Sequence, residues 1–158
     1  MQTVYIETTI PSYLGAHPSR QEPMASHQKL THRWWNDERH KFLLYSSVLV
    51  RLEASRGDAN AAQRRLAYLN GITELDVLPE TVRLEADLIR LFQLPLRAAA
   101  YAGHLAMAIL HRMDYLLTWN CTHLANATLQ KELMDYCLYH KLHLPIICTP
   151  ETLITQAS

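Results

Sequence analysis

Polar residues follow two apolar segments of the sequence, at positions where the carboxyl ends of parallel strands gather ligands. Glu7 and Thr9 come directly after Thr3–Ile6, and Asn120 comes after Tyr115–Thr118. The Glu7 carboxylate could ligate a metal ion or end its strand in solvent, and its strand-end position favours the metal. Thr9 could hydrogen-bond a carboxylate or a metal-bound water, or cap the next turn. Asn120 could orient a carboxylate or stabilise its own turn.

Tyr101 and His104 are three residues apart on an alanine-rich helical segment, so they share one face. A tyrosine there is usually a packing residue with a satisfied hydroxyl, although it could also fill the space of a metal. We interpret His104 first as a hydrogen-bonded core residue, while a cleft position would also suit a catalytic base. Glu53, near the start of a helical segment between Leu52 and Ala54, resembles an exposed helix acid when taken alone.

The composition excludes several other chemistries. The 158 residues include 15 basic and 15 acidic side chains, so the chain lacks the basic excess typical of non-specific phosphate binding. It contains no GxGxxG or GxxxxGK[ST] loop. The cysteines, Cys121, Cys137 and Cys148, form no CxxC pair, and Cys121 with His123 lacks a second ligand pair for zinc. Reduced thiols, no signal peptide and no membrane span are expected, in a cytoplasmic protein.

Short apolar runs alternate with helical segments, which predicts βαβ units in a single domain, residues 1–158. The expected strands are Thr3–Ile6, Phe42–Tyr45, an edge strand at Leu75 and Val77, Tyr115–Thr118, and Ile146–Cys148. The expected helices cover about Pro23–Arg39, Val48–Arg56, Asp58–Asn70, Pro79 to beyond Leu91, Leu96–Arg112 and Ala127–Lys141, with a short one starting at Thr149. Pro11 is expected to begin a loop that continues through Gly15 and Pro18. The prediction is a three-layer α/β/α domain with a mostly parallel sheet of about five strands and helices on both faces.

Four short segments, which together extend over nearly the whole chain, form an ordered set. They are VYIETTIPSYL at 4–14, LEAS at 52–55 with Gly57-Asp58 after it, AYAGHLA at 100–106, and DYLLTWNCTHLANA at 114–127. Together with ICTPE at 147–151, they resemble the motifs of the PIN domain family. The match is to its VapC-like branch, the toxin half of toxin–antitoxin pairs. The resemblance implies a PIN-like fold and an endoribonuclease that depends on Mg²⁺ or Mn²⁺, a hydrolase whose ion lowers the pKa of a bound water.

The resemblance assigns four motif positions to Glu7, Glu53, Tyr101 and Asn120, each of which is usually an acid in the family. Only the two glutamates keep a carboxylate, and Glu7 replaces the usual aspartate. The resemblance implies Glu7, Glu53 and Asn120 as metal ligands, with Thr9 as an assisting catalytic residue and His104 as an accessory one. Because Mg²⁺ is bound mainly through anionic oxygens and water, a weakened metal centre is expected.

Two functional hypotheses follow, and the sequence leaves open whether the protein is an enzyme. The first is a metal-dependent endoribonuclease acting on RNA. The second is a catalytically impaired PIN domain that binds an antitoxin or RNA, and it is motivated by the neutral residues Tyr101 and Asn120. A homodimer is also expected. Asp114 precedes its strand and is interpreted as a turn residue at the opposite edge. Trp34 and Trp35 are interpreted as packing or dimer-contact residues.

Overall fold

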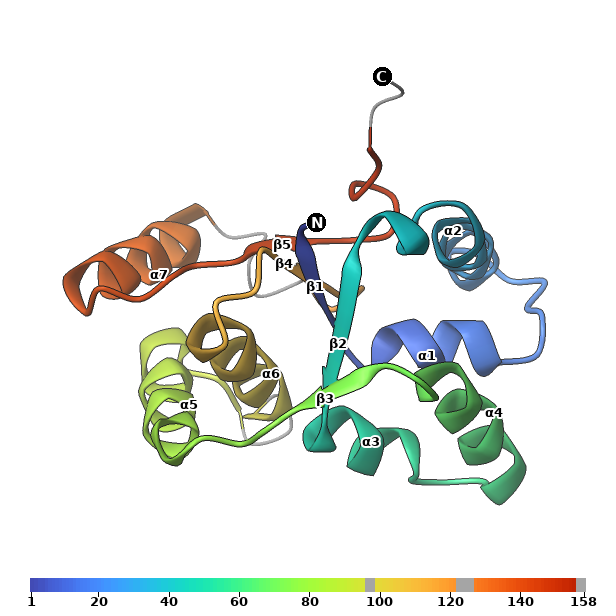
Figure 1. Ribbon diagram of the computed structural model, residues 1–158, viewed down its shortest axis with the longest axis horizontal. Helices are drawn as coiled ribbons and strands as arrows, with labels where there is room; N and C mark the ends of the chain where they lie inside the picture. Colours follow the sequence, from blue (N-terminus) through green and yellow to red (C-terminus); the bar gives the residue numbers. More distant parts are fainter. Residues whose placement is uncertain (96–98, 122–126, 156–158) are drawn as a thin grey trace.

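Five parallel strands form one sheet in the order β3-β2-β1-β4-β5 (Figure 1). The computed structural model describes residues 1–95, 99–121 and 127–155. The strands are β1 Thr3–Ile6, β2 Leu43–Ser47, β3 Thr73–Leu75, β4 Tyr115–Leu117 and β5 Ile146–Cys148. The predicted mostly parallel five-stranded sheet is confirmed, although Val77 lies beyond the edge strand. The strand order changes direction between β1 and β4, where open α/β sheets bind their ligands.

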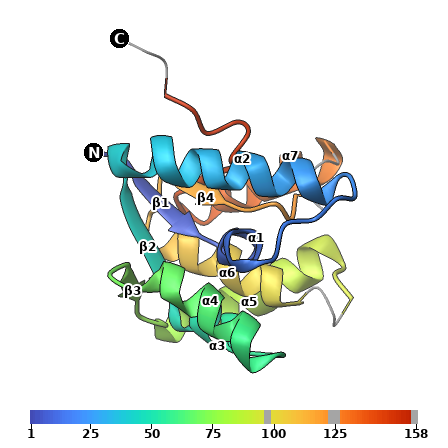
Figure 2. The same cartoon turned by 90° about the vertical axis from the view of Figure 1, so that its right-hand side faces the viewer.

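Helices cover both faces of the sheet and complete the three predicted layers (Figure 1). The helices are α1 Thr9–Gly15, α2 Met24–Asp37, the 3₁₀ turn η1 Arg39–Lys41, α3 Val48–Ala54, α4 Ala59–Leu69, α5 Pro79–Phe92, α6 Ala99–Leu110 and α7 Ala127–Tyr139. Figure 2 faces the layer formed by α1, α2 and α4, while α5, α6 and α7 lie on the opposite side. No helix in the described ranges is long and apolar enough to cross a membrane.

The central strand β1 supplies side chains to both layers. Val4 and Ile6 belong to one buried cluster with Trp34 of α2, whereas Tyr5 belongs to the other with Leu105 of α6. Successive side chains of a strand point to opposite faces, so a strand buried on both sides is apolar throughout. Tyr5 is the exception, because it carries a hydroxyl group into the interior while having no exposed surface.

Both tryptophans of α2 are packing residues, which decides between the two interpretations of them. Trp34 is 1% exposed, and its Nε1 donates to the Leu153 carbonyl oxygen at 2.7 Å. Trp35 is buried beside it, with the Arg39 guanidinium 4.7 Å from the centre of its ring. These contacts attach the C-terminal segment and η1 to the α2 layer.

A helix, α1, occupies the segment after β1 where the sequence predicted a loop at Pro11. Pro11 is the third residue after the N-cap Thr8, within the first turn, where backbone N–H groups have no partner in the helix. The proline therefore removes no helical hydrogen bond. Gly15, the last residue of α1, lets α4 approach closely: a Cβ atom there would lie 3.1 Å from the backbone nitrogen of Arg65.

Side chains cap the N-termini of α3 and α4. Ser47 is the N-cap of α3 and accepts a hydrogen bond from the backbone of Val50, and Asp58 caps α4 by accepting one from Ala61 at 2.9 Å. Each cap satisfies a backbone donor that the helix itself leaves unpaired. Ser47 also begins the chain of contacts described below.

The short helix predicted from Thr149 is wrong. The segment is a turn in which the Thr149 backbone N–H donates to Thr152 Oγ1 at 3.0 Å and the Thr152 backbone N–H donates to the Thr149 carbonyl. The Leu153 backbone N–H also donates to the Thr149 carbonyl at 3.0 Å, so the segment makes a single turn that does not continue as a helix. The predicted helix start at Leu96 lies outside the described residues, and α6 is described from Ala99.

Candidate functional site

Glu7 and Glu53 lie at the carboxyl edge of the sheet, beside the change in strand order. The backbone of Glu7 extends the β1–β4 pairing by donating to the Leu117 carbonyl oxygen at 3.1 Å. Asn120 follows β4 at the same edge, as the sequence predicted, and so does Thr118, which the sequence placed in the strand. Asp114, in contrast, joins the opposite ends of β1 and β4, where its Oδ2 accepts from the backbone of Thr3 at 2.8 Å.

The Glu7 carboxylate is buried and held through one of its oxygens. It is 5% exposed, and its Oε2 accepts from the backbone nitrogen of Thr9 at 3.0 Å and from Thr9 Oγ1 at 2.5 Å. Thr118 Oγ1 donates to the same oxygen at 2.8 Å. Thr9 Oγ1 is itself oriented by the backbone N–H of Trp119 at 2.9 Å. Thr9 therefore hydrogen-bonds the carboxylate, as one of its two interpretations proposed. No described residue hydrogen-bonds Oε1 of Glu7.

The Glu53 carboxylate is held in a matching way, again through one oxygen. Helix α3 is shorter than predicted because the Ser55 hydroxyl bonds the Leu52 carbonyl at its end, so Glu53 lies in its last turn. Glu53 Oε1 accepts from Thr8 Oγ1 at 2.6 Å and contacts Nε2 of His104. With 24% of its side chain exposed, Glu53 is not a free surface acid. Within the described residues, its Oε2 has no hydrogen-bond partner.

The electrostatic surroundings keep Glu53 ionised. Burial alone would raise its pKa, but the hydrogen bond with the His104 ring lowers it. The Thr8 hydroxyl and the nearby Arg56 act in the same direction, and the pKa falls below the usual carboxyl value. Glu53 is thus an anion whose charge is balanced partly by the protein.

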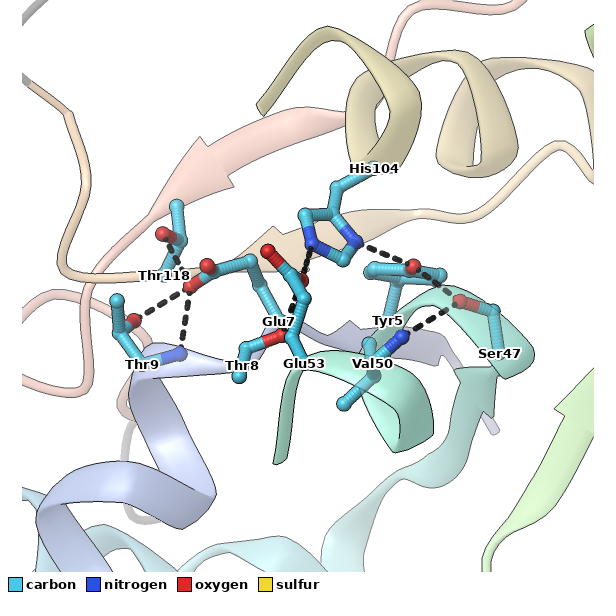
Figure 3. A network of polar contacts seen from close by, with 9 residues as sticks. All are labelled: Tyr5, Glu7, Thr8, Thr9, Ser47, Val50, Glu53, His104 and Thr118. Carbon is cyan, nitrogen blue, oxygen red and sulfur yellow. Dashed lines mark hydrogen bonds and ion pairs between the residues drawn. The ribbon is translucent and has the colours of Figure 1, made fainter. Parts of the chain in front are cut away.

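One turn of the chain positions both carboxylates. Thr8 bonds Glu53 while its neighbour Thr9 bonds Glu7, and Figure 3 shows the two carboxyl groups between Thr9 and His104. Both charges act on the buried Tyr5 phenol: burial is the main reason that the pKa of Tyr5 is raised, and Glu7 and Glu53 raise it further. The sequence prediction that Glu7 and Glu53 share one edge agrees with this arrangement.

His104 is the hydrogen-bonded core residue that the sequence suggested. Its ring is 1% exposed, and both of its nitrogens are engaged, since Nδ1 lies 2.8 Å from the Tyr5 hydroxyl and Nε2 contacts Glu53. The Tyr5 hydroxyl in turn lies 2.7 Å from Ser47 Oγ. Both ring nitrogens are engaged within the protein, which agrees with the core interpretation of His104.

The other two motif positions differ from the glutamates. Tyr101 is 3% exposed and belongs to the core cluster of α5 and α6, so the packing interpretation is confirmed. Burial raises the pKa of Tyr101, and the charges of Cys121 and Glu7 raise it further, so a neutral phenol lies within electrostatic reach of Glu7. Asn120 is half-buried, and its backbone N–H donates to Thr118 Oγ1 at 2.8 Å. Its side-chain amide hydrogen-bonds none of the described residues.

The sequence interpretation missed four hydrogen-bonding residues of this site. These are Tyr5, Thr8, Ser47 and Thr118. One signal was present for Tyr5, because a buried tyrosine in a central strand needs a partner for its hydroxyl. Its two partners are His104 of α6 and Ser47 at the end of β2. The spacing of the sequence does not indicate that these residues meet Tyr5.

The donor set suits a hard dication held by few protein ligands. Among the described residues, no group of three or more His, Cys, Asp or Glu gathers at one point. Mg²⁺ is commonly bound by one or two carboxylates, with water completing its octahedron. One oxygen of Glu7 and one of Glu53 that no described residue hydrogen-bonds, together with the amide oxygen of Asn120, are ligands of that kind. Burial and the charge of Glu7 raise the pKa of Cys121, which makes its thiol a poor metal ligand.

Comparisons with known proteins show the fold. No family model matches the sequence, and no curated protein matches it. In the crystal structure of VapBC2 from Rickettsia felis bound to a DNA fragment from their promoter, one chain is similar to this protein. The alignment covers 94% of this chain and 98% of that one, with a TM-score of 0.52 and 13% sequence identity. The PIN-like three-layer fold expected from the sequence is confirmed.

Proposed function

We propose that the chain is a VapC-like endoribonuclease of the PIN type with a weakened metal centre. The observation that carries the proposal is the pair of carboxylates at the strand-order switch, each anchored by hydrogen bonds to one oxygen. Anchoring only one oxygen fixes the direction of the other. The similarity of the fold to a VapBC2 chain supports the proposal.

Glu7, Glu53 and the amide oxygen of Asn120 would hold Mg²⁺ or Mn²⁺. When bound, the ion supplies a water of lowered pKa and neutralises charge on the phosphate being cleaved. The remaining work belongs to the chain itself. Thr9 and Thr118 orient Glu7, and the buried donors around Glu53 keep that residue ionised before any ion arrives.

Cleavage of structured RNA tests the proposal. Purified protein is incubated with the RNA in Mg²⁺, in Mn²⁺ and in excess chelator, and the products are separated on a denaturing gel. Cleavage in either metal that the chelator abolishes is expected. Glu132→Gln is a suitable control because this glutamate is exposed on α7, away from the carboxylate pair. Absence of chelator-sensitive cleavage would remove the claim of enzymatic activity.

A second candidate function is favoured by one observation, the buried neutral Tyr101 at the third motif position. In that case the chain is a catalytically impaired PIN domain that binds an antitoxin or RNA without cutting it. Calorimetric titration with Mn²⁺ separates the two candidates, since saturable binding by the unmodified protein favours the nuclease. No detectable binding favours the impaired module.

The proposed partners are an RNA substrate, an antitoxin protein and a second copy of the chain. The antitoxin is proposed from the similarity to a VapBC2 chain, and the RNA and the homodimer from the motif resemblance. Sedimentation velocity over a range of protein concentrations tests the homodimer directly. A single monomeric species up to high concentration would exclude it.

A further inference from the structure

A continuous line of buried hydrogen bonds leads to Glu53 from the cap of α3 (Figure 3). Ser47 Oγ lies 2.7 Å from the Tyr5 hydroxyl, which lies 2.8 Å from His104 Nδ1, and His104 Nε2 contacts Glu53 Oε1. Ser47, Tyr5 and His104 are each at most 1% exposed. The line therefore joins β1, the end of β2 and α6 to the carboxylate without access to water.

The two ends of the line define the direction of its hydrogen bonds. The backbone N–H of Val50 can only donate, and it donates to Ser47 Oγ at 3.4 Å. Ionised Glu53 can only accept, so His104 Nε2 must carry a hydrogen and donate it. With a neutral ring, Nδ1 accepts from Tyr5, and the Tyr5 oxygen accepts from Ser47. Every hydrogen in the line then has an acceptor.

A His104 ring with a hydrogen on both nitrogens would break this pattern. If Nδ1 also carried a hydrogen, Tyr5 would have to accept there and donate to Ser47. The Ser47 hydrogen would then have no acceptor within the line, and unsatisfied polar groups are costly in a buried setting. The network therefore favours neutral His104 protonated at Nε2.

We propose that Ser47, Tyr5 and His104 are positioning residues for Glu53. Ser47 and Tyr5 hold the His104 ring in the tautomer that has its hydrogen on Nε2. The Nε2–H group then fixes Glu53 Oε1, which leaves Glu53 Oε2 to bind a dication. The inference rests on the proposed function for the role of the ion and deepens it, because it assigns Tyr5 and Ser47, which lie outside the four motif positions. Such outer partners fix ligand orientation in many metal sites.

Nitrogen-15 NMR of the histidine rings tests the tautomer without any metal. The His104 signals are identified by their absence from the His104→Gln variant. The unmodified protein is expected to show hydrogen on Nε2 only, and Tyr5→Phe is expected to lose this single tautomer. Hydrogen on Nδ1 in the unmodified protein, or an unchanged single tautomer in Tyr5→Phe, would overturn the proposal.

Calorimetric titration with Mn²⁺ tests the consequence for the site. Tyr5→Phe should weaken Mn²⁺ binding on the order of tenfold, as is typical when an outer partner of a ligand is lost. Tyr136→Phe is the matched control, because it also deletes a phenol hydroxyl, but one that bonds Asp87 between α7 and α5. Circular dichroism establishes that both variants are folded.

Substitutions at His104 provide a rescue. His104→Gln keeps an N–H that can reach Glu53 and should retain most of the Mn²⁺ affinity, whereas His104→Leu should lose about as much as Tyr5→Phe or more. Equal affinity in the unmodified protein, Tyr5→Phe and His104→Leu would overturn the positioning role and leave the proposed function standing. If the unmodified protein binds no Mn²⁺, the proposed function fails, and the NMR result alone decides whether the line fixes the tautomer.

Discussion

The two halves of the proposed acidic centre, the glutamate pair and the neutral pair, differ in charge. Glu7 and Glu53 retain their charge and are surrounded by donors, whereas Tyr101 and Asn120 are neutral, and Tyr101 is part of the core. The donors around the glutamates do part of what a dication does, because they balance negative charge. In the proposed metal site, different residues therefore determine the orientation of the ligands and the total negative charge.

The two glutamates also differ from each other. Glu7 is held mainly by its own turn, through Thr9 two residues away, and by Thr118, which directly follows the neighbouring strand β4. Glu53 depends on α6, because His104 reaches it from 51 residues along the chain. The orientation of Glu7 is therefore largely local, while that of Glu53 depends on the packing of α6 against the sheet.

Removal of both charges should have the largest effect. The double variant Glu7→Gln, Glu53→Gln keeps the size of both side chains but loses the anionic ligands. RNA cleavage should fall on the order of 10²-fold or more, since metal assistance is worth several kcal/mol of transition-state stabilisation. Initial cleavage rates in Mn²⁺ measure the loss. A double variant as active as Glu132→Gln would show that the carboxylates are not the centre.

Restoring an acid in the neutral half should have the next largest effect. Tyr101→Asp should strengthen Mn²⁺ binding by about tenfold or more, because Mg²⁺ and Mn²⁺ prefer anionic oxygen. Without metal, the same variant should lose about 2–4 kcal/mol of stability through a core cavity and a buried charge, and Mn²⁺ should recover part of it. Calorimetry and thermal unfolding with and without Mn²⁺ measure both effects.

Tyr101→Phe is the control for that substitution, because it keeps the ring and adds no charge. It should leave Mn²⁺ affinity unchanged. If Tyr101→Asp binds Mn²⁺ no better than Tyr101→Phe, the missing charge at this position does not limit binding.

A smaller effect is expected from the local anchor of Glu7. Thr9→Val deletes the hydroxyl that donates to Glu7 Oε2 at 2.5 Å and should cost about 1.5–3 kcal/mol of stability, as a lost hydrogen bond to a charged group does. Thr9→Ser retains the hydroxyl and should lose less than half of that. Denaturant unfolding of the three proteins compares them, and equal stability of the valine and serine variants would contradict the anchoring role.

The smallest effect concerns pH. The pKa of Glu53 is lower in the folded protein than its usual value of 4.5. The carboxylate therefore contributes stability that is present above pH 4.5 and is lost as the pH falls through the lower folded value. The difference in melting temperature between the unmodified protein and Glu53→Gln should narrow over that range. A difference independent of pH between 7 and 3 would mean that Glu53 gains nothing from its partners.

Local sequence patterns predicted most of the scaffold. The buried strands are short apolar runs, and Ser47 and Asp58 stand where helix N-caps belong. The segment at Pro11 misled the prediction, since the chain pattern does not show whether a proline falls in a first turn or in a helix interior. The signals of a helix start at Thr149 also misled the prediction, because the chain makes a single turn there, closed by backbone bonds from Thr152 and Leu153, and does not continue as a helix.

The site was predictable only in part. Strand-end position indicated Glu7 and Asn120, and motif resemblance was needed for Glu53. The pairing of Glu53 with His104 depends on α3 and α6 lying together, which is a consequence of tertiary packing. The same is true of Tyr5, whose hydroxyl meets one partner from the end of β2 and one from α6.

Crystals soaked in Mn²⁺ and measured at the manganese absorption edge show whether Glu7 and Glu53 bind one metal ion together. One anomalous peak is expected, in contact with a carboxylate oxygen of Glu7 and one of Glu53, and it should disappear in the Glu7→Gln, Glu53→Gln double variant. A peak elsewhere, or none at saturating Mn²⁺, would contradict this expectation.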